Sequence, residues 1–169
     1  SYSELNKLKD SSKDFDEKEF FSHPENFESN FMPYVSNANI LLSCHYWDPK
    51  APVYLNKDDL RTLSGRLSII GDITCDIQGS LKSTLRSSTH DDPYFDYNSS
   101  TEVEEPAFSD DKNITVMAVD TCPNALALDA SEYFGGRLIE SVFRPWLSSG
   151  ETNQIIERAI ILKDGKLTE

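Results

Sequence analysis

The chain has 169 residues, which is enough for one domain or a large part of one. With 38% hydrophobic and 11% aromatic residues, its composition is that of a folded globular chain and excludes general disorder. The formal net charge of −13 at pH 7 disfavours binding to nucleic acids and to anionic membrane surfaces, because both carry negative charge themselves.

The sequence contains no apolar run close to the roughly 18–20 residues that span a bilayer. Residues 1–21 also lack the apolar middle of a signal peptide, so a soluble, cytoplasmic protein is expected. The three cysteines, Cys44, Cys75 and Cys122, are odd in number and show no CxxC spacing. They are therefore expected to be reduced thiols rather than a disulfide framework or a structural zinc site.

The first part of the chain predicts a strand, a helix and a second strand after a lead-in. Residues 1–38 are charged and helix-prone, and short helices are expected there. The apolar run 40–44 predicts a strand buried on both faces, as in a parallel sheet. Residues 56–63 begin with an N-cap residue followed by acids in the first turn, which predicts a crossover helix. The apolar run 67–72 predicts the second buried strand.

The middle of the chain is predicted to be a long loop followed by a third strand. Residues 74–109 are rich in Ser, Asp, Thr, Asn and Pro, and only Tyr94, Phe95 and Tyr97 are expected to anchor them. A loop of this length inside a compact domain tends to be functional. Residues 114–119 predict a third strand, parallel to the other two and adjacent to them in one sheet.

The last part of the chain predicts helices and a small hairpin. Residues 126–147 carry apolar side chains at mixed helical spacings, interrupted by Gly135 and Gly136, which indicates one long or broken amphipathic helix. Residues 148–169 indicate a short helix followed by a hairpin with an Asp-Gly turn. The whole chain is predicted to be α/β, with a parallel sheet and flanking helices that begin in the middle of a fold.

Chemistry is expected where the predicted strands end, because ligands of open parallel sheets bind beyond the carboxyl ends of the strands. Three such ends are present: residues 44–47, 72–76 and 119–123. Each places polar, aromatic or thiol groups where a buried strand gives way to a loop. A crevice shared by the three ends is therefore predicted.

Simpler roles compete with this prediction. Asp72, Asp76 and Asp120 can each cap a turn by accepting backbone N–H groups. His45 is more often an ordinary histidine than a catalyst, and the cysteines are more often small buried apolar residues. Three acidic runs lack the spacing of metal ligands and are expected to be solvated loop faces. They are residues 91–92, 102–105 and 110–111. The sequence also contains neither G-x-G-x-x-G nor G-x-x-x-x-G-K-[ST], the turns that cradle phosphates.

Three segments together resemble the lysine ketoglutarate reductase domain of bifunctional aminoadipate semialdehyde synthase and the related fungal saccharopine dehydrogenase that forms lysine. They begin with HPENFESN at residue 23, GDITCDIQ at residue 71 and VMAVDTCP at residue 116, and cover well over half of the chain. The resemblance implies a partial Rossmann-like sheet. It implies a helical lead-in at 1–38, the later half of a nicotinamide-binding domain with a return helix at 39–147, and a terminal helix and hairpin at 148–169.

The family reaction joins lysine and 2-oxoglutarate through an imine that a nicotinamide hydride reduces to saccharopine, or runs in reverse. The resemblance implies contacts with NAD or NADP at Tyr46, Ile73, Val119, Asp120, Thr121 and Cys122. It implies saccharopine contacts at Thr74, Cys75 and Asp76. These positions fall at the three strand ends that the sheet rule had marked.

The sequence departs from the family pattern after the third strand. The family's Leu-Pro is Cys122-Pro123 here, and its second Leu-Pro is Ala127-Leu128, which leaves the details of this loop open. The family's substrate domain, with its catalytic Lys and His, and its glycine-rich cofactor turn would precede Ser1. No catalytic residue is therefore assigned, and the chain is expected to be inactive without the rest of the enzyme. The alternative is a non-catalytic α/β ligand-binding or regulatory interaction domain.

Overall fold

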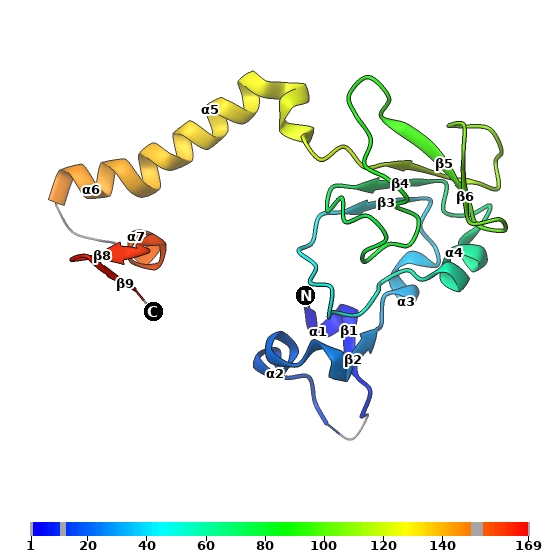
Figure 1. The fold of residues 1–169 in the computed structure, drawn as a ribbon, viewed down its shortest axis with the longest axis horizontal. Helices are drawn as coiled ribbons and strands as arrows, with labels where there is room; N and C mark the ends of the chain where they lie inside the picture. The colour runs from blue at the N-terminus through cyan, green and yellow to red at the C-terminus, as the bar shows by residue number, and fades with distance from the viewer. Residues whose placement is uncertain (1, 11–12, 150–153, 169) are drawn as a thin grey trace. The chain divides into compact units, whose positions relative to one another are not determined.

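The computed structural model of the chain describes residues 2–10, 13–149 and 154–168. The chain divides into two compact units, residues 1–121 and residues 122–169. The first unit contains a sheet of five strands in the order β3-β4-β7-β5-β6, of which β3, β4, β5 and β6 are labelled in Figure 1. Their bounds are Ile40–Ser43 for β3, Ile69–Asp72 for β4, Tyr94–Asn98 for β5, Val103–Glu105 for β6 and Ile114–Met117 for β7.

The three predicted strands are parallel and adjacent. Ile40 pairs with Ile69 in the register of β3 and β4, and Ile69 pairs with Thr115 in the register of β4 and β7. This arrangement confirms the predicted α/β class with a partial Rossmann-like sheet and flanking helices. The helix α4 (Lys57–Leu63) connects β3 to β4, and a capping box formed by Asn56 and Asp59 satisfies its first backbone N–H groups.

The main core lies on one face of this sheet. Register places Ile70 of β4 beside Val116 of β7 and Phe95 of β5, and all three are buried together with Leu60 and Leu63 of α4. The opposite face is different, because Ile40 is 59% exposed and Leu42 is 68% exposed. The prediction that the run 40–44 is buried on both faces is therefore wrong. This strand ends the sheet order, and an apolar run does not distinguish such a strand from a central one.

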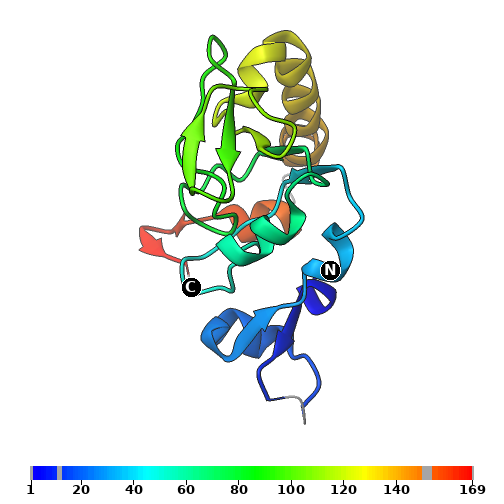
Figure 2. The same cartoon turned by 90° about the vertical axis from the view of Figure 1, so that its right-hand side faces the viewer.

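The prediction of one long loop over residues 74–109 is also wrong. This stretch contains β5, which pairs antiparallel with both β7 and β6, so the sheet is mixed (Figures 1 and 2). Phe95 and Tyr97 are buried, as expected of anchors, whereas Tyr94 is 45% exposed. Asp96 between them is also buried, and this charged residue interrupts the apolar pattern by which a strand is recognised.

The lead-in contains the expected short helices and two strands that were not predicted. The helical elements are α1 (Tyr2–Leu5), α2 (Glu17–Ser22), the 3₁₀ turn η1 (Pro24–Asn26) and α3 (Met32–Val35). The strands β1 (Asn6–Leu8) and β2 (Phe27–Ser29) pair antiparallel. Leu8, Phe20 and Phe27 form a separate small core there. The local pairing of β1 with β2 stabilises this segment together with its aromatic contacts.

The second unit contains the long helix and the hairpin expected from the sequence. Its elements are η2 (Cys122–Leu126), α5 (Ala127–Leu138), the π-helical turn η3 (Ile139–Phe143), α6 (Arg144–Ser149), α7 (Gln154–Ala159), β8 (Leu162–Lys163) and β9 (Lys166–Leu167). The hairpin turns at Asp164 and Gly165, where φ is positive. Among the helices that the structure describes, none combines the length and the apolar character needed to cross a bilayer. The domain boundaries at 38 and 147 stay a prediction.

Candidate functional site

Hydrogen bonds join the segments that follow the three parallel strands. After β4, the Thr74 hydroxyl lies 3.1 Å from the Ser43 Oγ of β3 and donates to the His45 carbonyl at 3.0 Å. The next residue, Cys75, donates from its thiol to the carbonyl of Ala118, directly after β7, at 3.1 Å. The three strand ends marked by the sequence therefore meet at one edge of the sheet.

Asp72 and Asp76 have different roles at this edge. Asp72 is buried, and its carboxylate accepts from the Thr84 hydroxyl at 2.6 Å and from the Cys75 N–H at 3.3 Å. It therefore caps the turn, which is the simpler role considered for it. Asp76 is half-buried, and its carbonyl accepts from the Gly79 N–H at 2.8 Å. Its carboxylate has no hydrogen-bond partner among the described residues, and remains available to a ligand.

The backbone of the turn from Cys75 to Gly79 is held in an uncommon conformation. Cys75 has φ 54° and Gln78 has φ 52°, both in the left-handed region that residues with a side chain rarely adopt. A Cβ added at Gly79 would lie 2.5 Å from the Asp76 Cβ and 2.8 Å from the Asp76 carbonyl oxygen. Only glycine fits there, so Gly79 allows the tight turn that presents Asp76. Such local strain is common at binding sites.

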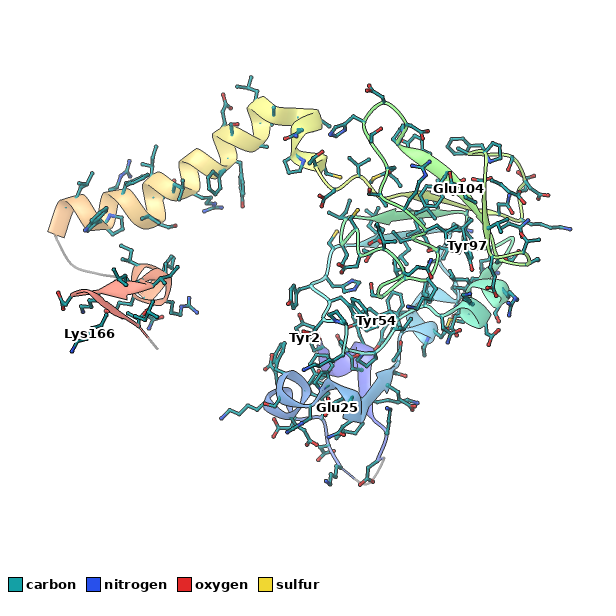
Figure 3. All side chains as sticks on the ribbon, viewed as in Figure 1. Tyr2, Glu25, Tyr54, Tyr97, Glu104 and Lys166 are labelled. Atoms are coloured by element: carbon teal, nitrogen blue, oxygen red, sulfur yellow. The ribbon has the colours of Figure 1, made fainter. Side chains whose placement is uncertain are left out.

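His45 is half-buried and takes part in a polar network with two buried serines. Its Nδ1 lies 3.1 Å from the Ser43 Oγ, and its Nε2 lies 2.9 Å from the Ser80 Oγ. Its ring packs edge-on against Tyr54, with 4.8 Å between ring centroids (Tyr54 is labelled in Figure 3). Burial lowers the pKa of His45 below 6.5, although the carboxylates of Asp72 and Asp76 act in the opposite direction. Burial therefore favours the neutral form of the ring.

The cofactor contacts implied by the resemblance are more scattered. Ile73 is 40% exposed beside Thr74, and Val119 is buried. Tyr46 is 75% exposed and lines a pocket of about 160 Å³ together with aromatic residues of the lead-in. Asp120 is exposed, and the Thr121 carbonyl lies 3.1 Å from a ring nitrogen of His90. The remaining residue, Cys122, is half-buried at the start of η2 in the second unit.

Several polar residues at this edge were missed by the sequence prediction. Ser43, Ser80, Thr84 and Ser88 are buried. Ser43 forms a hydrogen bond with Thr74, Ser80 with His45 and Thr84 with Asp72, and Ser88 binds the backbone at the end of β7. The Ser88 N–H donates to the Ala118 carbonyl at 2.8 Å, and its hydroxyl accepts from the Ala118 N–H at 2.9 Å. The available signal was the cluster of hydroxyl residues at 80–88, which includes Leu81 and Leu85 inside an otherwise polar stretch.

The site offers carboxylate, hydroxyl and carbonyl oxygens with an apolar residue, Ile73, beside them. In the part of the chain that the structure describes, no group of three or more His, Cys, Asp or Glu side chains is arranged to hold a metal ion. The sequence contains no glycine-rich turn to hold the cofactor's pyrophosphate.

Parallel strands whose carboxyl ends gather polar groups define the class of α/β proteins that bind ligands at this edge, including dinucleotide-binding proteins. Comparison with known proteins narrows the class, although no family model matches the chain. Alpha-aminoadipic semialdehyde synthase of Arabidopsis thaliana is 33% identical over 170 residues, which cover 95% of this chain and 16% of that protein. The mitochondrial alpha-aminoadipic semialdehyde synthase of Mus musculus is 24% identical over 92% of the chain and 19% of its own length.

A third relative is the saccharopine dehydrogenase (NAD⁺, L-lysine-forming) of Emericella nidulans. It is 26% identical over 121 residues, which cover 68% of this chain and 30% of that protein. Homologues named alpha-aminoadipic semialdehyde synthase and saccharopine dehydrogenase thus cover most of the chain, and the resemblance predicted from the sequence is confirmed. The chain spans less than a third of the length of each of these relatives.

Proposed function

We propose that this chain forms part of a nicotinamide-dependent oxidoreductase of lysine metabolism that makes or oxidises saccharopine. The observation that carries the proposal is the 33% identity to a plant alpha-aminoadipic semialdehyde synthase over 95% of the chain. The contacts among the three strand ends support it, because they hold Thr74 and Cys75, two of the residues carried over from the family, against the segments that follow β3 and β7.

On this proposal the segment after β4 binds the amino-acid substrate. The Asp76 carboxylate has no hydrogen-bond partner among the described residues, and it would accept a charge-assisted hydrogen bond from an ammonium or secondary amine group. Thr74 adds a hydroxyl oxygen beside it. The Cys75 thiol is occupied by the Ala118 carbonyl, so Cys75 would act through its backbone and through the turn it forms. Saccharopine, or lysine with 2-oxoglutarate, is the proposed substrate.

The cofactor, NAD or NADP, would supply the hydride when bound. In this chain Tyr46, Ile73 and Val119 would provide flat or apolar contacts, and Asp120, Thr121 and Cys122 would provide polar backbone. The proposal assigns no proton transfer to this chain, and the substrate domain and glycine-rich half of the enzyme are its expected partners. We therefore expect no hydride transfer from lysine, 2-oxoglutarate and reduced cofactor by the isolated chain.

A non-catalytic ligand-binding or regulatory α/β domain is the second candidate. The sequence feature that favours it is the lack of a glycine-rich phosphate turn, and the net charge of −13 would suit a basic partner. Backbone amide resonances of the ¹⁵N-labelled chain distinguish the two candidates. Saccharopine should shift the amides of 74–76, and NADH or NADPH those of Ile73 and 119–121. Ligand-induced shifts that avoid these residues, or no shifts at millimolar ligand, would contradict the proposed oxidoreductase.

A further inference from the structure

Four side chains at the strand ends form a continuous chain of hydrogen bonds. Ser80 Oγ lies 2.9 Å from His45 Nε2, and His45 Nδ1 lies 3.1 Å from Ser43 Oγ. Ser43 Oγ in turn lies 3.1 Å from Thr74 Oγ1, which donates to the His45 carbonyl at 3.0 Å. Ser43 and Ser80 are buried, with exposed fractions of 4% and 1%, so solvent does not satisfy their hydroxyl groups.

The last bond of this chain sets the direction of the others. The Thr74 hydroxyl faces two carbonyl oxygens, that of His45 at 3.0 Å and that of Ser43 at 3.4 Å, and a carbonyl oxygen only accepts, so we assign the single proton of Thr74 to the nearer His45 carbonyl. The contact between Ser43 and Thr74 then needs the proton of Ser43, and Thr74 accepts it. Ser43 has no second proton to give to His45, so its oxygen accepts from the ring. The ring nitrogen facing Ser43 must therefore carry a hydrogen.

A neutral imidazole has one N–H group, so the other ring nitrogen accepts from the Ser80 hydroxyl. We infer that His45 is held as the Nδ1–H tautomer and is a positioning residue, which fixes the Thr74 oxygen as an acceptor. Thr74 Oγ1 then has one lone pair left after its bonds to Ser43 and the His45 carbonyl. Nothing at this oxygen remains to donate to a ligand.

The inferred acceptor selects a class of ligand group. Thr74 Oγ1 and the Asp76 carboxylate are two residues apart, and both would accept hydrogen bonds without donating any. Such a pair suits an ammonium or secondary amine and disfavours a carboxylate or phosphate. This step rests on the proposed function for the identity of the substrate, whereas the tautomer of His45 is a property of the chain alone.

The tautomer is measured by long-range ¹H–¹⁵N correlation of the histidine rings at pH 7.5, with His45 assigned by comparison with the His23→Gln and His90→Gln variants. We expect a protonated Nδ1 and an unprotonated Nε2 in His45. The opposite pattern would overturn the inference. Ser43→Ala should change the pattern because it removes the acceptor of the Nδ1–H group, and Ser87→Ala, at an exposed position outside the network, should leave it unchanged.

The ligand class is tested with two probes of equal length, L-lysine and L-2-aminoadipate, which end in an ammonium and a carboxylate. Lysine should shift the Thr74 and Asp76 amides at concentrations at which aminoadipate does not. Thr74→Val should weaken lysine binding by about tenfold, as expected for the loss of one hydrogen bond to a charged group, and Thr74→Ser should preserve it. A stronger response to aminoadipate would contradict the acceptor role of Thr74.

The positioning role is tested by a rescue at His45. His45→Asn keeps an N–H donor near the Nδ1 position and should preserve lysine binding within about twofold, whereas His45→Phe should lose about tenfold. Equal losses in both variants, in step with a fall in melting temperature, would show that His45 only stabilises the fold. If wild-type chain responds to neither probe, the proposed function is contradicted, and the ring pattern alone decides the tautomer.

Discussion

Asp96 and Asp72 are both buried carboxylates of the sheet, but they accept different sets of hydrogen bonds. The difference distinguishes a network that only stabilises the fold from one that leads to the candidate site. Asp96 on β5 accepts from the Phe108 and Ser109 N–H groups at 2.9 Å and from the Thr115 hydroxyl at 2.7 Å. Asp72, at the end of β4, has two donors, Thr84 and the Cys75 N–H. The hydrogen bonds of Asp96 form a closed network, which fixes the loop after β6. The network of Asp72 continues through a strained turn to Asp76 and Thr74, where oxygen atoms can still accept hydrogen bonds.

The largest effect on stability is expected at Asp96. Asp96→Ala removes several hydrogen bonds to a charged group and leaves buried donors unsatisfied, so the free energy of unfolding should fall by about 3 kcal/mol or more. Urea unfolding monitored by circular dichroism measures this loss. Asp91→Ala, at an exposed position of the preceding loop, is the control and should have little effect. A small loss at Asp96 would show that its network does not hold the sheet extension.

A matched pair of isosteric changes sharpens the contrast between the two carboxylates. Thr84→Val removes the 2.6 Å donor of Asp72, and Thr115→Val removes the 2.7 Å donor of Asp96. Asp72 would keep only the 3.3 Å bond from Cys75, whereas Asp96 would keep its backbone donors. Thr84→Val should therefore cost about 2 kcal/mol and Thr115→Val about 1 kcal/mol. Equal costs in urea unfolding would contradict the distinction between an open and a closed network.

Strongly acidic pH should report on the Asp96 network. Burial alone would raise the pKa of Asp96, but hydrogen bonds from Thr115, Phe108 and Ser109 outweigh it and hold the pKa below 3.8. Because the folded pKa is below the unfolded one, this stabilisation is present above pH 3.8 and is lost as the pH falls through the folded value. Asp96→Asn should flatten this part of the stability curve. An unchanged slope below pH 3.8 would assign the acid sensitivity to other groups.

Mildly acidic pH should report on the second network through His45, with a smaller effect. The pKa of His45 is lowered mainly by burial, and the opposing carboxylates of Asp72 and Asp76 limit the shift. Because the pKa of His45 in the folded chain is below 6.5, the contribution of neutral His45 to the free energy of unfolding is complete above pH 6.5. It is lost as the pH falls toward the pKa of the folded chain. Thermal unfolding between pH 7.5 and 5 should show the decrease in wild type and less of it in His45→Asn. Identical profiles would indicate that partial burial does not lower the pKa of His45 in the folded chain.

The sequence was sufficient for the parallel part of the sheet. Three short apolar runs at crossover distances fixed β3, β4 and β7, and the capping residues at Asn56 and Asp59 marked α4. The antiparallel extension could not be found in the same way. Its central strand contains Asp96, which is buried only because donors from residues 108–115 reach it. Such tertiary compensation leaves no periodic pattern in the sequence.

The site was predicted at the level of the strand ends but not of individual contacts. Sheet geometry alone brings the ends of β3, β4 and β7 together, whatever their side chains. The bonds of His45 to Ser80 and of Thr74 to Ser43 join residues 35 and 31 positions apart. Local spacing therefore did not reveal them. Nor could it decide that Asp72 caps the turn while the carboxylate of Asp76 stays open.

The open carboxylate of Asp76 gives the most direct test that the strand ends bind the substrate. Isothermal titration of the wild-type and Asp76→Ala chains with saccharopine measures the affinity, and melting curves measure stability. The loss of one charge-assisted hydrogen bond, about 1.5–3 kcal/mol, should weaken binding by about one to two orders of magnitude while the melting temperature changes little. An unchanged saccharopine affinity in a destabilised Asp76→Ala protein would contradict the assignment and leave Asp76 with a structural role only.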